Sequence, residues 1–509
     1  MADVCMTDVD VVIVGSGIGG LVAGALLARY GWRSLVCESH DTPGGAAHGF
    51  THQGFHFDTG PSFYCGLSDP ASWNPLRQVL DVLGETVEAI AYDPLGHYHF
   101  PEGTLPVYRK SADYQRAIAQ FTPTGAVEYA QFEAPLLALY EALRRIPTLA
   151  LRADWRLIPV LLRQYPGALL RLLPHLSLIQ GAAGEVMDAR VQDPWVRRLI
   201  DLECFLLSGL KAAGTVTPEI SVMLGERANS VVDYPIGGSE ALVNALVRGL
   251  TRWGGQLRLK APVAQICLQN GQVSGVRLQS GEQISAPVVI SNATLWDTYQ
   301  TLIAPEDLPA SLQQQAQSTA AVDSFMHLHL GLRAEGLEGL TGHHVVVHHA
   351  DQDITAPGNT CMISIPSVWD AALAPSGHHV LHAYTLEPFD GWERNAQYGA
   401  QKQARVASLY RAVERVIPDW RDRQVVERIG TPLTHARYLR RYRGTYGPAI
   451  AAGQGQFPSC KTPIRGLFRV GDSTLPGIGV PAVAASGILC ANTLVSPQQT
   501  AELLAEVGL

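Results

Sequence analysis

Residues 9–38 read VDVVIVGSGIGGLVAGALLARYGWRSLVCE, and this stretch decides the fold. The β-branched run at 9–14 predicts a buried parallel strand, residues 21–30 predict a helix, and residues 34–37 predict a second strand. The first strand and the helix are joined by G-x-G-x-x-G, which in this context is typical of a dinucleotide-binding βαβ unit. The alternative is a glycine-rich turn in some other α/β fold.

The residue types of this loop have physical reasons. Gly15 permits the tight turn, Gly17 lets the backbone approach a pyrophosphate, and Gly20 lets the helix pack closely on the strand. The N-terminus of the helix stabilises the phosphate charge. Glu38 follows the second strand and is placed to accept hydrogen bonds from a ribose hydroxyl. The predicted phosphate loop comprises Gly15, Ser16, Gly17, Ile18, Gly19 and Gly20.

Later segments extend the predicted site toward a flavin. A second glycine pair soon after Glu38 would let the chain cross close to the phosphates and ribityl chain, and the loop at 57–62 would reach the flavin ring. Near the C-terminus a strand ends in Gly-Asp, which suits ribityl hydroxyls, and a helix begins soon after it, facing the flavin pyrimidine. The further predicted cofactor residues are Ser39, Gly44, Gly45, Ala46, Ala47, Gly60, Ser62, Val263, Asn292, Gly471, Asp472, Gly479, Val480 and Ala482.

Composition excludes several other classes of protein and of binding site. The length of 509 residues predicts two to four domains, and a net charge of −8 argues against a dedicated nucleic-acid binder. The eight cysteines form no CxxC pair, so no zinc site or disulfide framework is expected. His327 and His329 share one face of a predicted strand and are taken as sheet-face residues, so no metal site is predicted. Residues 1–8 lack the positive region of a secretory signal, and the expected location is cytoplasmic with peripheral membrane association.

The motif set resembles a known family. GSGIGG, Glu38, the PGG at 43–45, the Gly-Asp at 471–472 and the following PGxG helix resemble the FAD-dependent carotenoid isomerase and phytoene desaturase family, and within it the carotenoid (prolycopene) cis–trans isomerase branch. The resemblance covers nearly the whole chain. More telling segments are 200–205, 291–298, 364–367, 373–377, 430–435 and 444–448.

The resemblance implies FAD as cofactor and a carotenoid taken from a membrane as substrate. The predicted fold class is α/β, with a discontinuous Rossmann-type FAD-binding domain of the glutathione-reductase and amine-oxidase kind. That domain is expected at 1–95, 220–299 and 426–509. A helical membrane-associating subdomain is expected at 96–219, and a β-sheet substrate domain at 300–425.

Several activities stay open. The isomerase hypothesis involves no net redox change, whereas a desaturase would pass hydrogen to the flavin and electrons on to a quinone or oxygen. Segments 46–49 and 63–66 differ from what is expected of the plant-type isomerase. Because they are predicted to lie near the flavin, a desaturase activity stays open as an alternative. An amine oxidase usually has arginine where Ala46 stands. A non-catalytic prenyl-lipid escort protein is an alternative of another class.

Catalytic carboxylates and a membrane surface are two further expectations. Glu203 and Asp201 lie in an apolar stretch that would raise a pKa, and the alternative is an ion pair with Arg197 or Arg198. Between residues 144 and 178 six arginines alternate with leucine and aromatic residues. This stripe, with three members predicted on one helical face, indicates docking on an anionic membrane, and the alternative is an ordinary helical subdomain with solvated arginines. The three are Arg152, Arg156 and Arg163.

Overall fold

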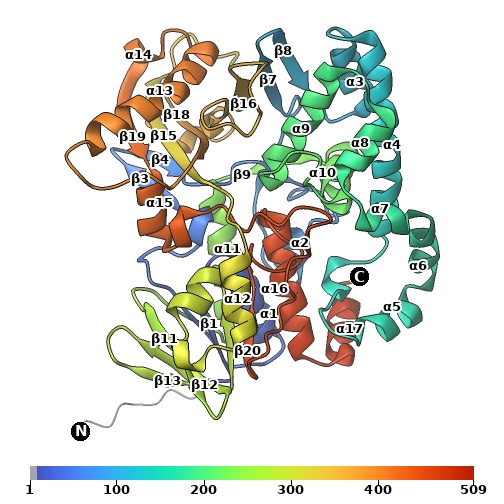
Figure 1. Ribbon diagram of the computed structural model, residues 1–509, viewed down its shortest axis with the longest axis vertical. Coiled ribbons are helices and arrows are strands. Elements are labelled where there is room, and N and C mark those ends of the chain that lie inside the picture. Colours follow the sequence, from blue (N-terminus) through green and yellow to red (C-terminus); the bar gives the residue numbers. More distant parts are fainter. Residues whose placement is uncertain (1–8, 509) are drawn as a thin grey trace.

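A parallel sheet lies at the centre of the lower half of the molecule in the computed structural model, which describes residues 9–508 (Figure 1). Its strand order is β10-β2-β1-β14-β20, and every neighbouring pair is parallel. β1 is buried along its whole length, as its β-branched sequence predicts. The strands are β1 (Val11–Val14), β2 (Ser34–Cys37), β10 (Gln256–Arg258), β14 (Val288–Ser291) and β20 (Leu467–Arg469).

Three helices pack their apolar faces around this sheet. α1 (Ile18–Arg29) contacts both α11 (Ser239–Arg252) and α16 (Val480–Leu494), and all three contribute to one core. The charge-free run at 11–28 is therefore divided into β1 and α1. Among residues 9–508, no helix has both the length and the apolarity that crossing a bilayer requires.

A hairpin sheet covers the lower edge of the parallel sheet. β11 (Val263–Gln269), β12 (Gln272–Leu278) and β13 (Gln283–Ser285) are antiparallel. Asn270 and Gly271 turn the first hairpin with φ of 53° and 72°, which is the conformation predicted by the Asn-Gly sequence.

The second large sheet forms the upper left of the molecule, in the order β19-β15-β18-β17-β16-β7-β8 (Figure 1). One face packs against α13 (Tyr398–Val416), and the other faces the cavity described below. β7 and β8 come from the start of the segment predicted to be helical. The strands are β7 (Gly96–Phe100), β8 (Gly103–Val107), β15 (Ser324–Arg333), β16 (His343–Val347), β17 (Thr360–Ser364), β18 (His378–Glu387) and β19 (Gln424–Gly430).

Helices form the upper right of the molecule and its right flank (Figure 1). They share a core with the cavity face of the second sheet. The helices are α3 (Ser111–Ala119), α4 (Pro123–Leu143), α5 (Leu157–Gln164), α6 (Pro166–Leu172), α7 (Leu176–Gln180), α8 (Ala183–Arg190), α9 (Pro194–Ser208) and α10 (Thr217–Asn229). The other elements are α2 (Pro75–Leu83), α12 (Ala310–Ser318), α14 (Trp420–Arg423), α15 (Pro432–Leu439), α17 (Pro497–Glu506), β3 (Gly49–His52), β4 (Phe55–Asp58), β5 (Tyr64–Cys65), β6 (Ala89–Ala91) and β9 (Val232–Pro235).

The predicted arginine stripe faces outward only in part: Arg163 is exposed, but Arg152 and Arg156 are not. Arg152 is buried and donates to Asp154 and to the carbonyl of Val495, and Arg156 donates to Asp154 and to the carbonyl of Thr493. Both arginines therefore tie this segment to the C-terminal end of α16. The guanidinium groups turn inward because they find a carboxylate two residues away and the free carbonyls at the end of a helix, which are stronger acceptors than water.

Candidate active site

A cavity of about 670 Å³ lies between the carboxyl ends of the parallel strands and the second sheet. Ligands of open α/β sheets bind at this edge, and the volume suits a small-molecule or cofactor site. Most of the predicted cofactor residues line it: Gly15, Gly17, Ile18, Gly19, Glu38, Ser39, Gly44, Gly45, Ala46, Ala47, Gly60, Val263, Asn292, Gly471, Asp472, Gly479 and Val480. Ser16, Gly20, Ser62 and Ala482 are not part of its wall.

Glu38 is held in place by four donors. The backbone N–H and the hydroxyl of Ser16 donate to Oε2 over 2.8 and 2.6 Å, and the N–H of His40 and the hydroxyl of Ser39 donate to Oε1 over 2.8 and 3.1 Å. These four donors fix both oxygens of the carboxylate at the cavity wall. Ser16 therefore serves the site by positioning Glu38 rather than by lining the cavity.

Glycines from three segments meet where a phosphate chain would lie. A Cβ on Gly17 would lie 2.5 Å from Nδ2 of Asn292, and one on Gly19 would lie 3.0 Å from the backbone nitrogen of Gly471. Gly44 pairs with Gly17 in an isolated parallel bridge and has a φ of 114°. Side chains would fill this cradle, so its residues fit a dinucleotide that contacts the backbone directly.

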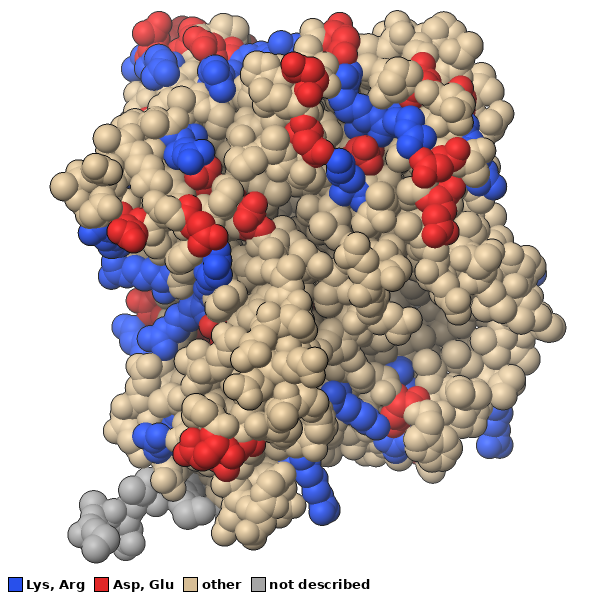
Figure 2. All heavy atoms as spheres, in the orientation of Figure 1, with Lys and Arg blue, Asp and Glu red and all other residues tan. Residues whose placement is uncertain are grey.

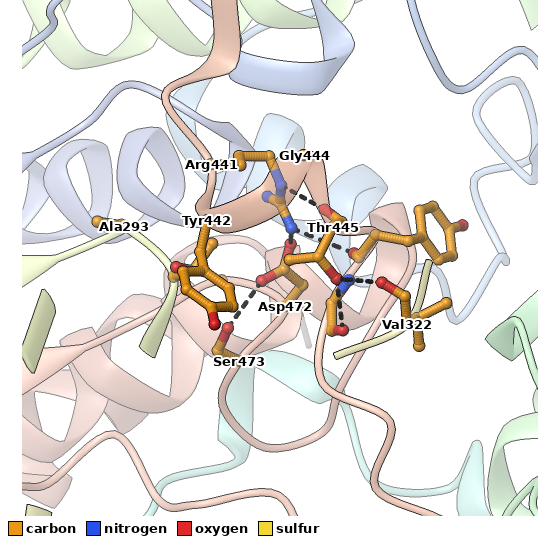
Figure 3. A network of polar contacts seen from close by, with 12 residues as sticks. Ala293, Val322, Arg441, Tyr442, Gly444, Thr445, Asp472 and Ser473 are labelled. Atoms are coloured by element: carbon orange, nitrogen blue, oxygen red, sulfur yellow. Dashed lines mark hydrogen bonds and ion pairs between the residues drawn. The ribbon is translucent and has the colours of Figure 1, made fainter. Parts of the chain in front are cut away.

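Arg441 ties the loop at 441–446 to the end of β20 (Figure 3). Its guanidinium donates to Oδ2 of Asp472 over 2.5 Å and to the carbonyls of Thr445 and Tyr446 over 2.8 and 3.2 Å. The hydroxyl of Ser473 donates to the other oxygen of Asp472. The carboxylate predicted to bind ribityl hydroxyls is thus fixed at the cavity wall by a residue that sequence reasoning missed, because no motif marks Arg441.

Rings from the second sheet and α15 close the cavity opposite the glycines. Phe325, His327, Tyr384, His435 and Tyr446 line it. Burial lowers the pKa of His435 to about 4 and holds that of His327 well below its usual range, so both imidazoles are neutral at pH 7. His435 donates from Nδ1 to the carbonyl of Gly444 over 2.7 Å, which leaves Nε2 as an acceptor. Segments 430–435 and 444–448, singled out by the family resemblance, hold two of these rings.

The two predicted catalytic carboxylates lie elsewhere. Glu203 accepts from the hydroxyls of Tyr114 and Tyr129 and from Arg227, inside the helical core. Asp201 accepts from the N–H of Ala212, and burial raises its pKa. Neither lines the cavity. The ion pair of Glu203 is with Arg227 rather than with the neighbours Arg197 or Arg198, because α10 packs against α9 and brings Arg227 to it.

Comparison with known proteins identifies the family. Residues 18–495 match the sequence model of the family described as "Flavin containing amine oxidoreductase". The chain belongs to the flavin-containing amine oxidoreductase family. Membership makes it a flavin-dependent enzyme rather than a non-catalytic escort protein, and the FAD prediction is confirmed at the level of this family.

Relatives within this family are carotenoid enzymes by name. The chain is 33% identical over 495 residues to "Prolycopene isomerase 1, chloroplastic" of an Oncidium hybrid cultivar, covering 96% of this chain and 84% of that protein. It is 27% identical to "Phytoene desaturase (neurosporene-forming)" of Cereibacter sphaeroides, with 94% and 93% covered. The predicted resemblance to the carotenoid isomerase and desaturase group is confirmed.

Solved structures of oxidoreductases share the fold. An oxidoreductase from Methanosarcina mazei superimposes with a TM-score of 0.62 at 18% identity, covering 94% of this chain and 99% of that one. A putrescine oxidase bound to putrescine gives a TM-score of 0.62 at 16% identity, with 98% and 100% covered. The predicted α/β flavoprotein fold is confirmed.

Proposed function

We propose that this chain is an FAD-dependent carotenoid cis–trans isomerase that acts on a poly-cis carotene without net redox change. The observation that carries the proposal is the 33% identity to a prolycopene isomerase over 96% of the chain. The cavity supports it, because the aromatic and imidazole rings opposite the glycine cradle offer flat faces to a conjugated chain.

In this proposal the glycine cradle, Glu38 and Asp472 hold FAD, which supplies the electron-transfer chemistry when bound. The protein's own groups bind and orient the polyene and keep water out. Phe325 and Tyr384 pack edge to face, 5.6 Å between ring centroids, and form a wall against which a polyene can lie. His435 offers a neutral Nε2 that can accept a proton.

The second candidate is a carotenoid desaturase that passes electrons to a quinone. Phytoene desaturases match nearly the whole chain at 26–27% identity, which favours this alternative over other flavin chemistry. An anaerobic assay with a poly-cis carotene separates the two when it is run once with pre-reduced protein and once with oxidised protein plus a quinone, because only oxidised flavin can accept hydrogen from the substrate. The isomerase converts many substrate molecules per flavin with no change in double-bond count; a product with additional double bonds would overturn the isomerase proposal.

Asp472→Ala is expected to weaken FAD binding about ten- to a hundredfold, because a hydrogen bond to a charged group contributes roughly 1.5–3 kcal/mol. The measurement is flavin release on dilution, followed by fluorescence. The matched control is Asp390→Ala, which removes the exposed partner of Arg443 from the same region and should leave flavin binding unchanged. Equal flavin retention in both variants would remove Asp472 from the binding site.

Membrane docking is assigned to exposed apolar side chains rather than to the arginine stripe. Six large apolar residues between 155 and 176 are 51–76% exposed, and Arg163 and Arg171 are exposed among them. Figure 2 shows charged side chains along the top, the left side and the lower edge of this face, and few on the right-hand flank at the level where Figure 1 places α6. Such a surface suits insertion into the headgroup region of an anionic bilayer. The docking surface consists of Trp155, Ile158, Leu162, Leu170, Leu173 and Leu176.

Replacing Leu162, Leu170 and Leu173 by serine is expected to abolish cosedimentation with vesicles that contain anionic lipid, because burial of each leucine contributes about 1.5–3 kcal/mol. The control variant carries Val127→Ser and Val425→Ser, which remove exposed apolar residues outside the docking surface. Both variants should retain bound flavin. Undiminished vesicle binding by the leucine variant would refute docking through this surface.

A further inference from the structure

A row of side chains crosses the second sheet, starting at the cavity. The strand registers pair His327 with Tyr384, Tyr384 with Met362, Met362 with Val345 and Val345 with Tyr98. Directly paired residues point to the same face of a sheet. With strands about 4.8 Å apart, the four steps span roughly 19 Å. His327 and Tyr384 line the cavity, so the row leads away from it.

The row faces an internal space. Its side chains belong to the core that the sheet shares with α9 and α10, and burial raises the pKa of Tyr98 and of Tyr384. Tyr98, Met362 and Tyr384 nevertheless keep accessible surface and are only half-buried. This accessible surface adjoins the cavity that His327 and Tyr384 line, and a ligand that extends along the row would cover it. Glu219, in the first turn of α10, is also half-buried.

Polar groups along this space have no protein partner. Within residues 9–508, no hydrogen bond or ion pair involves the hydroxyls of Tyr98, Tyr384 and Tyr446 or the carboxyl group of Glu219. Tyrosines buried elsewhere are satisfied: the hydroxyl of Tyr234, for example, donates to Asp58 over 2.7 Å. Tyr98, Glu219, Tyr384 and Tyr446 are half-buried, so their polar atoms are accessible and free to bind a ligand that lies along the row.

Two tyrosines at the flavin cavity pack on one ring, and the carboxyl group of Glu219 acts electrostatically on one of them. The rings of Tyr384 and Tyr446 lie 5.6 and 5.2 Å from that of Phe325, which they both contact edge to face. Burial raises the pKa of Glu219 to about 8. The pKa of Tyr446 is raised to about 12, mainly by burial and to a lesser extent by the nearby charge of Glu219. At pH 7 the side chains of Tyr384, Tyr446 and Glu219 are neutral and can donate or accept hydrogen bonds. Such groups suit an alcohol or ketone oxygen rather than an ion.

We propose that the substrate is an oxygen-bearing polyene, with its conjugated chain along the His327–Tyr98 row and its hydroxyl or keto oxygen bound by Tyr384, Tyr446 and Glu219. This inference rests on the proposed flavin-dependent isomerisation of a carotenoid, and it replaces the hydrocarbon carotene by an oxygen-bearing carotenoid as the preferred substrate. A hydrocarbon carotene would leave these groups unpaired, and a site built to hydrogen-bond an oxygen discriminates against the analogue that lacks it.

The test compares a polyene hydrocarbon with the same polyene carrying one hydroxyl at an end of its chain, each presented in detergent micelles to the FAD-loaded protein. Quenching of tryptophan fluorescence gives the dissociation constants without turnover. The hydroxylated polyene is expected to bind at least about tenfold more tightly. The variants Tyr384→Phe and Tyr446→Phe should lose this preference and keep the affinity for the hydrocarbon.

Tyr410→Phe is the control, because its hydroxyl donates to Glu427 on the opposite face of the sheet, and it should retain the preference. Equal affinity of the wild-type protein for both polyenes, or a preference that survives both phenylalanine variants, would overturn the inference. Since only binding is measured, a failed isomerisation assay leaves this result intact. If the protein isomerises hydrocarbon polyenes and binds both ligands with equal affinity, the inference is overturned and the proposed isomerase function stands.

Discussion

Arg227→Met is expected to lower the free energy of unfolding by about 3–5 kcal/mol, because it leaves buried carboxylates without their cation. The side chain of Arg227 is 5% exposed, and it pairs with Glu203 and Glu133, which are 1% and 3% exposed. The hydroxyl of Tyr129 also accepts from this guanidinium. Chemical denaturation at saturating FAD, followed by circular dichroism, measures the loss.

Two further variants separate a buried network from a surface pair. Lys211→Met removes an ion pair with Asp353 in which the side chains are 42% and 45% exposed, and it should cost no more than about 1 kcal/mol. The double variant Glu203→Leu with Arg227→Met should be less destabilised than Arg227→Met alone, because it removes one of the unpaired carboxylates. An Arg227→Met protein as stable as Lys211→Met would contradict the proposed importance of the network.

Gly20→Ala is expected to reduce the flavin content of the purified protein at least about tenfold, equivalent to ~1.4 kcal/mol of binding free energy. A Cβ at Gly20 would lie 2.4 Å from the carbonyl oxygen of Gly15 and 3.1 Å from Cβ of Asn292. Neither backbone nor β-carbon can rotate away, so α1 must shift and open the glycine cradle. The ratio of flavin absorbance to protein absorbance gives the content.

Gly399→Ala is the matched control for this prediction. Gly399 lies in the first turn of α13, with nothing within 4 Å of the added Cβ, so flavin content should not change. Stability should be equal or slightly higher, because alanine favours helix over glycine. A fully yellow Gly20→Ala protein would show that α1 can move without affecting the cofactor.

Local rules account for the parts of the fold that the sequence predicted well. The strand at residues 34–37 has the predicted bounds, and the first strand and helix lie within a few residues of theirs. The turn at Gly15, with φ of 95°, and the close packing at Gly20 are properties of consecutive residues in one βαβ unit. Such features depend little on the rest of the chain, so a motif can reveal them.

The predictions for part of the arginine stripe and for Glu203 failed because the partners of these residues are distant in sequence. Arg152 finds the carbonyl of Val495, 343 positions away, and no periodicity in 144–178 indicates that contact. The spacing of arginines identified Arg163 and Arg171 as exposed, but it did not identify the exposed leucines and Trp155 between them. Glu203 likewise depends on Arg227, which α10 supplies.

The cavity wall opposite the glycines illustrates a third case. His327 and Tyr384 are neighbours because β15 pairs with β18 in a particular register, while Tyr446 arrives on a loop held by Arg441. None of these residues belongs to a short motif, and their shared surroundings exist only after the sheet has formed. The family resemblance singled out segments 430–435 and 444–448, but it did not show that their side chains face the cavity.

The strand order of the parallel sheet determines when the protein can acquire its cofactor during synthesis. β1 pairs with β14, and β14 pairs with β20, which ends at Arg469. The nascent βαβ unit therefore leaves the ribosome with both strand edges bare, until β10 covers β2 and β14 covers β1. A chain cut short before β20 would lack Gly471 and Asp472 of the nucleotide site and would leave the outer edge of β14 open to aggregation.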